Sequence, residues 1–480
     1  MKNKFIIFII ILFCIPVLVY AVSEKPPGSS NISGSSSSVS YKGATTFSSS
    51  VSEESKSYSS TQGSQNALLV SGGVSTIKNP SITKSGDSDG DNADFYGTNA
   101  AVLTYNNATL NIEGGTITTN GSHANAVFAY GTGIINISNT KINTTSNNSG
   151  GIMVTGGGTL TANSCTVKTT GNSSASIRSD RGGGTLTVNG GTYETNGVGS
   201  PAIYSTANII VNDANLISTS SEGLVVEGAN LIEINNTKVT DTNNSLNGNS
   251  ETYKNVFLYQ SMSGDAESGT ASFKAKNSTL ITNKGDTIFV TNTTATIELE
   301  NNIITNNDGD FLRIQTGKWG KSGSNGGNVT LTMSNQKIDG NIIVDSISTL
   351  EMKLSNSVFN GSINNENKAK NINLTLSSDS ILSLTQDTYL DSLKNSAEDN
   401  SNIYSNGEYK LFVDGKEITI NSKKYEEENE VTHAETKEEN TETVNESKGY
   451  IIYIALSLVL ISIVVLTSIL IVKNKKRKVN

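Results

Sequence analysis

The chain has 480 residues, of which 16% are charged and 35% are hydrophobic, and it contains 44 glycines but only 5 prolines. This composition is too apolar for a wholly disordered polar chain, and its 2 cysteines are too few for a disulfide scaffold. With only 2 histidines as well, a zinc enzyme or a histidine-dependent enzyme would be hard to assemble.

Residues 1–21 have the features of a secretory signal peptide. Two lysines precede an apolar core at Phe5–Val19, and small side chains stand at the expected cleavage site after Ala21. An uncleaved N-terminal anchor is the alternative. Cleavage would leave Cys165 as the one thiol of the mature chain, which would rule out a disulfide within it.

A serine- and glycine-rich segment, residues 22–65, follows the signal. It includes the serine runs Ser35–Ser38 and Ser48–Ser50. A segment of this kind has too few apolar side chains to offset the conformational entropy that is lost on ordering. We therefore expect residues 22–65 to form a flexible arm.

A repeat occupies residues 66–395. Thr109–Ile117 matches Thr185–Tyr193 in form: a short alternating strand, a tight polar turn, one further inward hydrophobe, and then threonine or serine. The first repeats begin about 22 to 26 residues apart, a period typical of solenoids. Later repeats include two longer gaps, at Asp241–Glu251 and Lys318–Gly327. Each repeat is too small to bury its own apolar face, so the repeats must stack around one shared core.

Asparagine recurs at equivalent turns of the repeat, at Asn139, Asn236, Asn335 and Asn356. Stacked side-chain amides can bond to one another along such a column. Alternating strands without helical periodicity indicate a parallel β-solenoid of about twelve coils. The leucine-rich repeat is excluded because its leucine and asparagine consensus and its helical half are missing, and a β-sandwich of many hairpins is the alternative.

The glycine-rich turns Gly182–Leu186 and Gly190–Thr192, set in this coil pattern, resemble those of right-handed parallel β-helix surface proteins. These proteins share the pectin-lyase-like fold and are described as adhesin-like. The resemblance covers about residues 66–395 and implies an all-β, right-handed parallel β-helix solenoid on a protein displayed at the cell surface. The same fold also hosts lyases, hydrolases, tailspikes and inert stalks, so the resemblance implies a fold more than an activity.

Two segments are expected directly after the repeat. An Asp-Gly pair at residues 414–415 stands between two short apolar strands, and this pattern predicts a hairpin that caps the solenoid within residues 396–422. Residues 423–449 are rich in glutamate and lysine and lack apolar periodicity. They are expected to form a solvated acidic stalk.

Residues 450–472 carry no charge and are long enough to cross a bilayer as one helix. Five basic side chains within residues 473–480 place this tail in the cytoplasm. We therefore expect a single-pass cell-membrane protein whose large N-terminal part is extracellular. The formal net charge is −9, and without its two basic ends the exterior part carries −16, which argues against nucleic acid as a partner.

Each coil also contains a second short strand, and alignment of these strands predicts an outward strip that is rich in aromatic and charged side chains. Aromatic rings stack on sugars and on partner side chains, and arginine supplies fixed donors. The strip is therefore expected to bind an extracellular glycan or protein. The alternative is that the loop Asp241–Glu251, or the loop around Trp319, covers it. The candidate ligand-binding residues are Phe128, Tyr130, Arg178, Asp180, Tyr204, Phe257 and Tyr259.

The densest acidic stretch of the repeat region lies at residues 87–94. Alternating carboxylates on a glycine-containing loop suit a hard cation such as calcium, although their spacing departs from that of an EF-hand. A solvated loop without a metal is the alternative, and no other cofactor is expected. The candidate metal ligands are Asp87, Asp89, Asp91 and Asp94.

A polysaccharide lyase or glycoside hydrolase is the alternative to a binding protein. Asp180 and Glu227 would lie two coils apart, about 9.6 Å along the stack, a spacing compatible with the acid pair of an inverting glycosidase. Arg178 or Arg181 could instead serve a lyase beside calcium-binding carboxylates. Neither arrangement has the tight acidic cluster that these enzymes need. The sequence therefore favours a non-enzymatic display protein, an adhesin.

Overall fold

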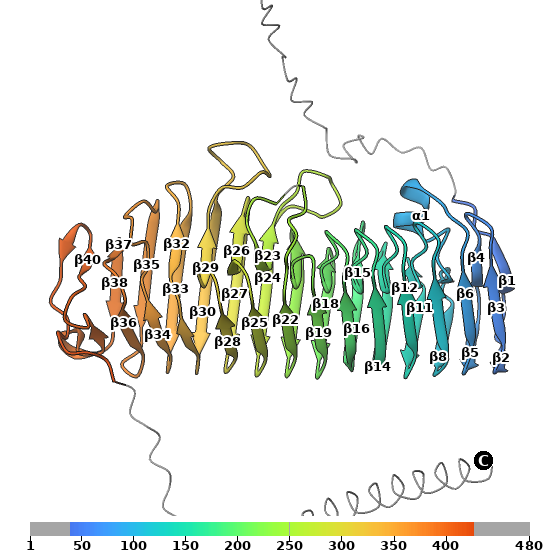
Figure 1. The fold of residues 1–480 in the computed structure, drawn as a ribbon, viewed down its shortest axis with the longest axis horizontal. Helices are drawn as coiled ribbons and strands as arrows, with labels where there is room; N and C mark the ends of the chain where they lie inside the picture. Colours follow the sequence, from blue (N-terminus) through green and yellow to red (C-terminus); the bar gives the residue numbers. More distant parts are fainter. Residues whose placement is uncertain (1–38, 249, 427–480) are drawn as a thin grey trace, which may run out of the picture. The chain divides into compact units, whose positions relative to one another are not determined.

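The computed structural model describes residues 39–248 and 250–426. In this part the chain consists mainly of β-strands, which stack in parallel into a β-solenoid of about 15 turns (Figure 1). The all-β solenoid predicted from the repeat is confirmed, and it has more turns than the twelve or so expected.

Four predicted segments lie outside the described residues: the signal peptide at 1–21, most of the stalk at 423–449, the span at 450–472 and the tail at 473–480. Among residues 39–248 and 250–426, no helix combines the length and the apolar character that crossing a membrane requires.

Each coil has up to three strands, because its sequence alternates inward hydrophobes with outward polar residues and is interrupted by short turns. Equivalent strands of successive coils pair in parallel and build three rows, which we call the first, second and third faces. The first face consists of β1 (Gly43–Phe47), β4 (Asn66–Val70), β7 (Val102–Thr104), β10 (Val127–Tyr130), β13 (Ile152–Thr155), β15 (Ile177–Ser179), β17 (Ile203–Ser205), β20 (Leu224–Glu227), β23 (Lys254–Tyr259), β26 (Asp286–Thr291), β29 (Leu312–Ile314) and β32 (Ile342–Val344).

The second and third faces form one large sheet over most of the stack. The second face consists of β2 (Ser52–Glu54), β5 (Val74–Lys78), β8 (Thr109–Glu113), β11 (Ile134–Ser138), β14 (Gly158–Thr169), β16 (Gly184–Thr195), β18 (Asn208–Asn212), β21 (Leu231–Asn235), β24 (Thr270–Lys276), β27 (Thr293–Glu300), β30 (Gly327–Ser334), β33 (Thr349–Ser355), β35 (Asn371–Leu376) and β38 (Ser392–Asn395). The long strands β14 and β16 continue into the third face, whose other strands are β3 (Ser57–Ser60), β6 (Ser81–Lys84), β9 (Thr116–Thr119), β12 (Lys141–Thr144), β19 (Asn215–Ser218), β22 (Lys238–Asp241), β25 (Thr279–Thr282) and β28 (Ile303–Asn306).

Two small sheets and two short helices complete the described structure. The helices are α1 (Gly90–Tyr96), between β6 and β7, and the 3-10 helix η1 (Glu398–Asn400). The four-stranded sheet contains β31 (Lys337–Asp339), β34 (Val358–Gly361), β36 (Ile381–Leu384) and β39 (Ile403–Tyr404). The three-stranded sheet contains β37 (Thr388–Leu390), β40 (Leu411–Val413) and β41 (Lys416–Glu417). In Figure 1, α1 and the longest loops project from the same edge of the stack.

The strand pairing confirms the alignment that the repeat predicted. On the second face the coil starts are in register, as in the pairing of Thr109 with Ile134. On the first face Val127, Ile152 and Ile177 share one inward position in three successive coils. A shift by one residue would turn these side chains out to solvent, so the hydrophobic alternation fixes the register.

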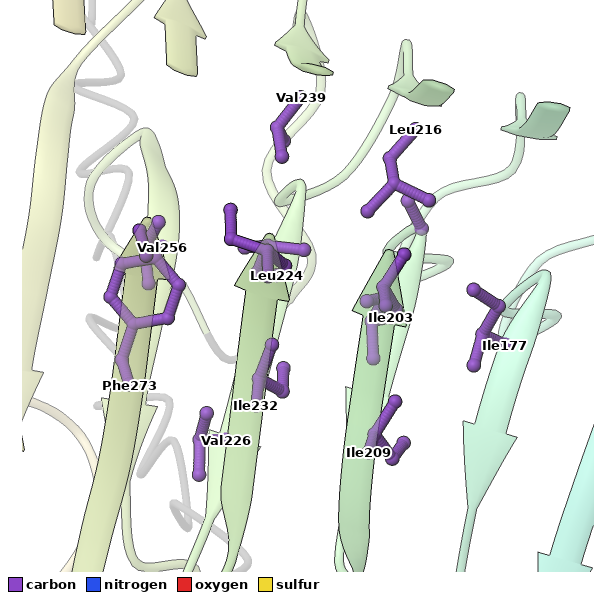
Figure 2. Packing of buried hydrophobic residues seen from close by; sticks show 14 of the residues in the cluster. Ile177, Ile203, Ile209, Leu216, Leu224, Val226, Ile232, Val239, Val256 and Phe273 are labelled. Carbon is purple, nitrogen blue, oxygen red and sulfur yellow. The ribbon is translucent and has the colours of Figure 1, made fainter. Parts of the chain in front are cut away.

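One thin hydrophobic core runs through the stack, and Figure 2 shows part of it. Ile209, Ile232 and Phe273 occupy one inward position of the second face in three successive coils, and all three are buried. Leu224 and Val256, from the first face, belong to the same cluster. Burying one such side chain contributes about 1.5–3 kcal/mol. Because neighbouring coils supply the contacts, a single coil would not be stable alone.

The asparagines at the turns have a left-handed backbone. The φ angles of Asn139, Asn236, Asn335 and Asn356 lie between 46° and 52°, a region that asparagine tolerates better than most residues. Asn356 Nδ2 donates to Asn335 Oδ1 at 2.6 Å, so the predicted amide ladder joins these two coils. A longer ladder on the second face joins Asn163, Asn189, Asn212 and Asn235.

The solenoid begins earlier than the sequence predicted. The expected flexible arm at residues 22–65 is wrong for residues 43–60, which contain β1, β2 and β3. Phe47 and Tyr58 point inward here, and their rings meet edge to face at 6.0 Å. Most of the surrounding residues are serine, threonine or glutamate. The alternation of inward and outward residues in this coil is therefore hard to recognise, because nearly all of its residues are polar.

The other end of the described stack contains the predicted hairpin. Strands β40 and β41 pair antiparallel around Asp414 and Gly415, whose φ angles of 50° and 70° suit a tight hairpin turn. Strand β40 also pairs in parallel with β37, which joins the hairpin to the coils before it. Because an open strand edge can recruit another chain, a hairpin in this position limits association through the end.

We expect Ile232→Ala to lower the free energy of unfolding by about 2–5 kcal/mol, because Ile232 is 0% exposed and its removal leaves a cavity between coils. The matched control is Ile303→Ala, since Ile303 also lies in a strand of the stack but is 68% exposed. That variant should change stability by less than about 0.5 kcal/mol. Equilibrium denaturant unfolding measures both, and equal effects would contradict this description of the core.

Candidate functional site

The outward strip predicted from the repeat lies on the first face. The register of the paired first-face strands turns the side chains of the strip away from the solenoid core, as the alternation of inward and outward residues predicted. One row of the strip, which we call the outer row, consists of Phe128, Met153, Arg178, Tyr204, Val225, Phe257 and Phe289. Two residues further along their strands, Tyr130, Glu227 and Tyr259 also point outward.

Helix α1 covers the N-terminal part of the outer row. Phe128 is 0% exposed, and a Cβ on Gly97, the residue that ends α1 in a left-handed conformation, would lie 2.8 Å from the Phe128 ring. Tyr96 of α1 packs edge to face on Tyr130, with 5.5 Å between ring centres. The expectation that Phe128 faces a ligand is therefore corrected, because an insertion between two coils lies over it. Tyr130 remains half-buried.

Charged residues occupy the middle of the strip. Arg178 Nη2 lies 2.8 Å from Asp180 Oδ2, and both side chains are largely buried. Burial raises the pKa of Asp180 to about 6, while the guanidinium of Arg178 opposes the rise. The carboxylate of Asp180 thus serves first as the partner of Arg178.

Glu227 is the buried acceptor beneath the C-terminal part of the strip. Its Oε2 accepts hydrogen bonds from the hydroxyls of Tyr204, at 2.5 Å, and Tyr259, at 2.8 Å. Its Oε1 accepts from the hydroxyl of Ser261. Asp180 and Glu227 are therefore both engaged by protein donors, which is typical of structural carboxylates rather than of an acid–base pair facing a substrate.

Two loops cover the C-terminal part of the strip. These are loop 242–253, between β22 and β23, and loop 315–326, between β29 and β30. Trp319 lies 5.6 Å from Tyr259 between ring centres, and Lys318 Nζ donates to the carbonyl of Gly248 at 2.9 Å, which ties the loops together. As a result Phe257 and Tyr259 are only 9% and 8% exposed. The sequence offered coverage of the strip by these loops as the alternative to an exposed strip, and the loops do cover its C-terminal part.

A recess of about 210 Å³ remains between these loops and the strip. Its aromatic wall consists of Tyr204, Phe257, Tyr259 and Trp319. Its polar wall consists of Glu222, Asn247 and Ser250, two of them from loop 242–253. A small concave site with aromatic surfaces and a few fixed polar groups is the usual form of a small-ligand site.

The recess therefore combines predicted and unpredicted residues. The repeat alignment predicted Tyr204, Phe257 and Tyr259, but the opposing wall comes from loops outside the repeat. Trp319 and Asn247 lie within the two long gaps of the repeat, in the loops that the sequence offered as a possible cover of the strip.

The end of loop 242–253 is joined to the recess through Lys254. This residue is 2% exposed, its Nζ lies 3.3 Å from Glu222 Oε1, and it donates to the carbonyl of Thr252 at 3.0 Å. The ammonium group also stands 4.5 Å from the centre of the Phe257 ring, within range of a cation–π contact. Lys254 thus connects the loop to both the polar and the aromatic wall.

A buried acid, Asp241, ends β22 immediately before loop 242–253. Asp241 is 0% exposed, and its Oδ1 accepts the backbone N–H of Asn243 at 2.8 Å. Among the described residues its Oδ2 has no hydrogen-bond partner. Burial raises the pKa of Asp241 to about 8; Glu222 adds to the rise and Lys254 opposes it.

Three of the four candidate calcium ligands have protein partners in the structure. Asp87 Oδ1 accepts the N–H of Ser122, and Asp89 stands immediately before α1. Asp91 pairs with Arg181 at 3.0 Å, and Asp94 pairs with His123 at 2.7 Å. Within residues 39–248 and 250–426, no group of three or more His, Cys, Asp or Glu side chains is arranged to hold a metal. Partners from other coils thus engage Asp87, Asp91 and Asp94, and the calcium site stays a prediction.

We expect Asp241→Asn to flatten the pH dependence of stability. Native Asp241 keeps its proton up to about pH 8, whereas an unfolded aspartate releases it near about pH 3.9. Between these values the native state binds more protons, so stability falls as the pH rises. The variant cannot titrate here, so its melting temperature should fall less between about pH 5 and about pH 8.

The control for this experiment is Asp308→Asn, which changes an exposed aspartate in a turn. Asp180 contributes to the pH dependence of all three proteins, so the difference between the wild type and Asp241→Asn isolates Asp241. If the wild type and Asp241→Asn had identical profiles of melting temperature against pH, the inferred protonated state of Asp241 would be contradicted.

Comparison with protein-family models, with curated proteins and with solved structures finds no match to this chain. Its assignment as a parallel β-solenoid therefore rests on the strand pairing in the described residues. A function for it has to be inferred from the recess and its surroundings.

Proposed function

We propose that this is a cell-surface display protein that binds a glycan in the recess of the first face. The observation that carries the proposal is the meeting of four aromatic rings, Trp319 among them, with Glu222, Asn247 and Ser250 around a space of about 210 Å³. A sugar ring offers an apolar face for stacking and hydroxyl groups for hydrogen bonding. The two walls of the recess supply a partner for each.

The floor of the recess is fixed before any ligand arrives. The hydroxyls of Tyr204 and Tyr259 are both held by Glu227, and the rings of Phe257 and Tyr259 stack at 4.4 Å with 12° between their planes. A preorganised aromatic floor loses little conformational freedom on binding. This supports recognition of a ligand by shape and stacking.

The remaining parts of the proposal come from the sequence. The signal peptide predicted at residues 1–21 and the span predicted at 450–472 would place the solenoid outside the cell, and the resemblance to adhesin-like proteins of the pectin-lyase-like fold fits display at a surface. The engagement of Asp180 and Glu227 by protein donors favours binding over polysaccharide cleavage. A protein ligand with an exposed aromatic or amide side chain is the competing occupant of the recess.

A glycan array probed with the full-length chain in detergent should give specific binding, and Trp319→Ala should weaken it about tenfold or more. The lost ring contributes stacking and apolar burial, and about 1.4 kcal/mol corresponds to a factor of ten. Asn136→Ala, at an exposed position on the second face, is the control and should bind as the wild type does. Binding to no glycan, or equal weakening by both variants, would refute the proposal.

A further inference from the structure

Most of the charges around the recess are paired with each other. Among the described residues that line the recess, Glu222 alone is charged. Lys254 Nζ lies 3.3 Å from Glu222 Oε1, so an ammonium group balances this carboxylate. Next to the recess on the same strip, Arg178 balances Asp180 at 2.8 Å. A net charge at the recess must therefore come from another residue.

That residue is Glu227, whose carboxylate lies beneath the aromatic floor. It is buried, and within the described chain it forms no ion pair. Hydroxyl groups donate to both of its oxygens, Tyr204 and Tyr259 to Oε2 and Ser261 to Oε1. A carboxyl group that accepts hydrogen bonds at both oxygens carries no proton. The floor of the recess therefore has one negative charge that no cation of the described chain balances.

Glu227 also makes the two tyrosine rings of the floor better partners for a cation. Burial raises the pKa of Tyr204 and of Tyr259 well above the usual value, and Glu227 adds to the rise, so both hydroxyls keep their protons and donate. A phenol that donates to a carboxylate is polarised, which makes its ring face more negative, and a negative ring face attracts cations. The floor therefore favours a positively charged group over an uncharged one.

The wall of the recess already binds one ammonium group of the chain itself. Lys254 Nζ stands 4.5 Å from the centre of the Phe257 ring and pairs with Glu222, and both of these partners line the recess. An aromatic face and a carboxylate thus hold a cation at its edge. Tyr259 and Trp319, whose ring centres are 5.6 Å apart, offer further aromatic surface, and no cation of the described chain lies over it.

A protonated amine on a sugar suits both walls of the recess. The sugar ring can stack on the aromatic wall, and an ammonium group has three N–H donors for the oxygens of Glu222, Asn247 and Ser250. Acetylation of the nitrogen would remove its charge. A carboxylate or sulfate on the sugar would be repelled by Glu227. The charges of the recess therefore distinguish between sugars that have similar rings.

We propose that the glycan bound in the recess carries a protonated amine, so that the ligand is an amino sugar whose nitrogen is not acetylated. The inference rests on the proposed function and names the class of its ligand. The sugar ring stacks on Tyr259 and Trp319, and its ammonium group lies above the floor, next to Glu222.

The test uses isothermal titration calorimetry on the full-length chain in detergent, with sugars that differ in one substituent. Glucosamine, galactosamine and mannosamine, as monosaccharides and as oligosaccharides, are each compared with the N-acetylated form and with the parent hexose. At a pH that protonates the amine, the amino form should bind at least about tenfold more tightly than its two counterparts. Raising the pH until the amine is neutral should remove this preference, because the ligand then lacks its charge.

Glu222→Gln removes the carboxylate of the polar wall and should weaken binding of the amino sugar about tenfold, with a smaller effect on the parent hexose. The matched control is Glu298→Gln. Glu298 also pairs with a lysine, Lys274, at 3.1 Å, but it lies on the second face. The control should keep the wild-type affinities. The three forms of each sugar give a result with the wild type even if Glu222→Gln does not fold.

The outcomes separate the two proposals. Equal or tighter binding of an N-acetylated or otherwise uncharged sugar, in this series or on the array, would overturn the inference and leave the recess proposal standing. A folded Glu222→Gln that keeps the full preference for the amine would also overturn the inference. Binding of no sugar in either experiment would overturn both proposals, and so would binding of choline or of a lysine-rich peptide in place of any sugar.

Discussion

Parallel register between coils is the constraint on which the rest of this molecule depends. Each strand bonds to the equivalent strand of the next coil, so one inward position becomes a continuous column of buried side chains, such as Ile209, Ile232 and Phe273. A slip by a single residue in any coil would turn such a column outward. Differences in sequence between the coils are therefore confined to the outward positions and to the turns. The longest insertions lie at turns and project from the stack.

The candidate site follows from this confinement. The outward aromatic row would be an unusually large apolar patch on an open sheet, and the insertions at the turns cover it. Helix α1 covers one part and loops 242–253 and 315–326 cover another, so a continuous strip becomes a fixed floor with one recess. Glu227 is central to this floor because its side chain and its carbonyl both hold neighbouring side chains.

The repeat allowed much of the fold to be predicted, because alternation within a strand is a local property of the sequence. It placed Phe128 and Phe257 on the outward side correctly, as the register confirms. It offered two loops as a possible cover but did not decide between an open and a covered strip, because contacts such as that between Tyr259 and Trp319 join residues far apart in the chain. The same limit applies to the acidic stretch at residues 87–94, since the sequence does not show that Asp91 pairs with Arg181.

Composition was misleading where the alternation was carried by very few apolar residues. Residues 43–60 contain mostly polar side chains, yet the inward Phe47 and Tyr58 are enough to place them in the stack. A coil at the end of a stack packs against the apolar side chains and strand edges that the neighbouring coil already presents. It therefore needs fewer hydrophobes than an isolated structure of the same length would.

The contacts of Arg181 have a mechanical consequence. A stack of coils can unravel from either end, one coil at a time, because each coil is held mainly by its neighbours. Arg181 joins Asp91 and Asp265, which lie 90 and 84 residues away from it along the chain, and so ties together coils that are not adjacent. A pulling force that peels coils from the N-terminal side would meet this cross-tie before it reached the recess. The load would then be shared between coils on both sides of Arg181 before the coils that line the recess open.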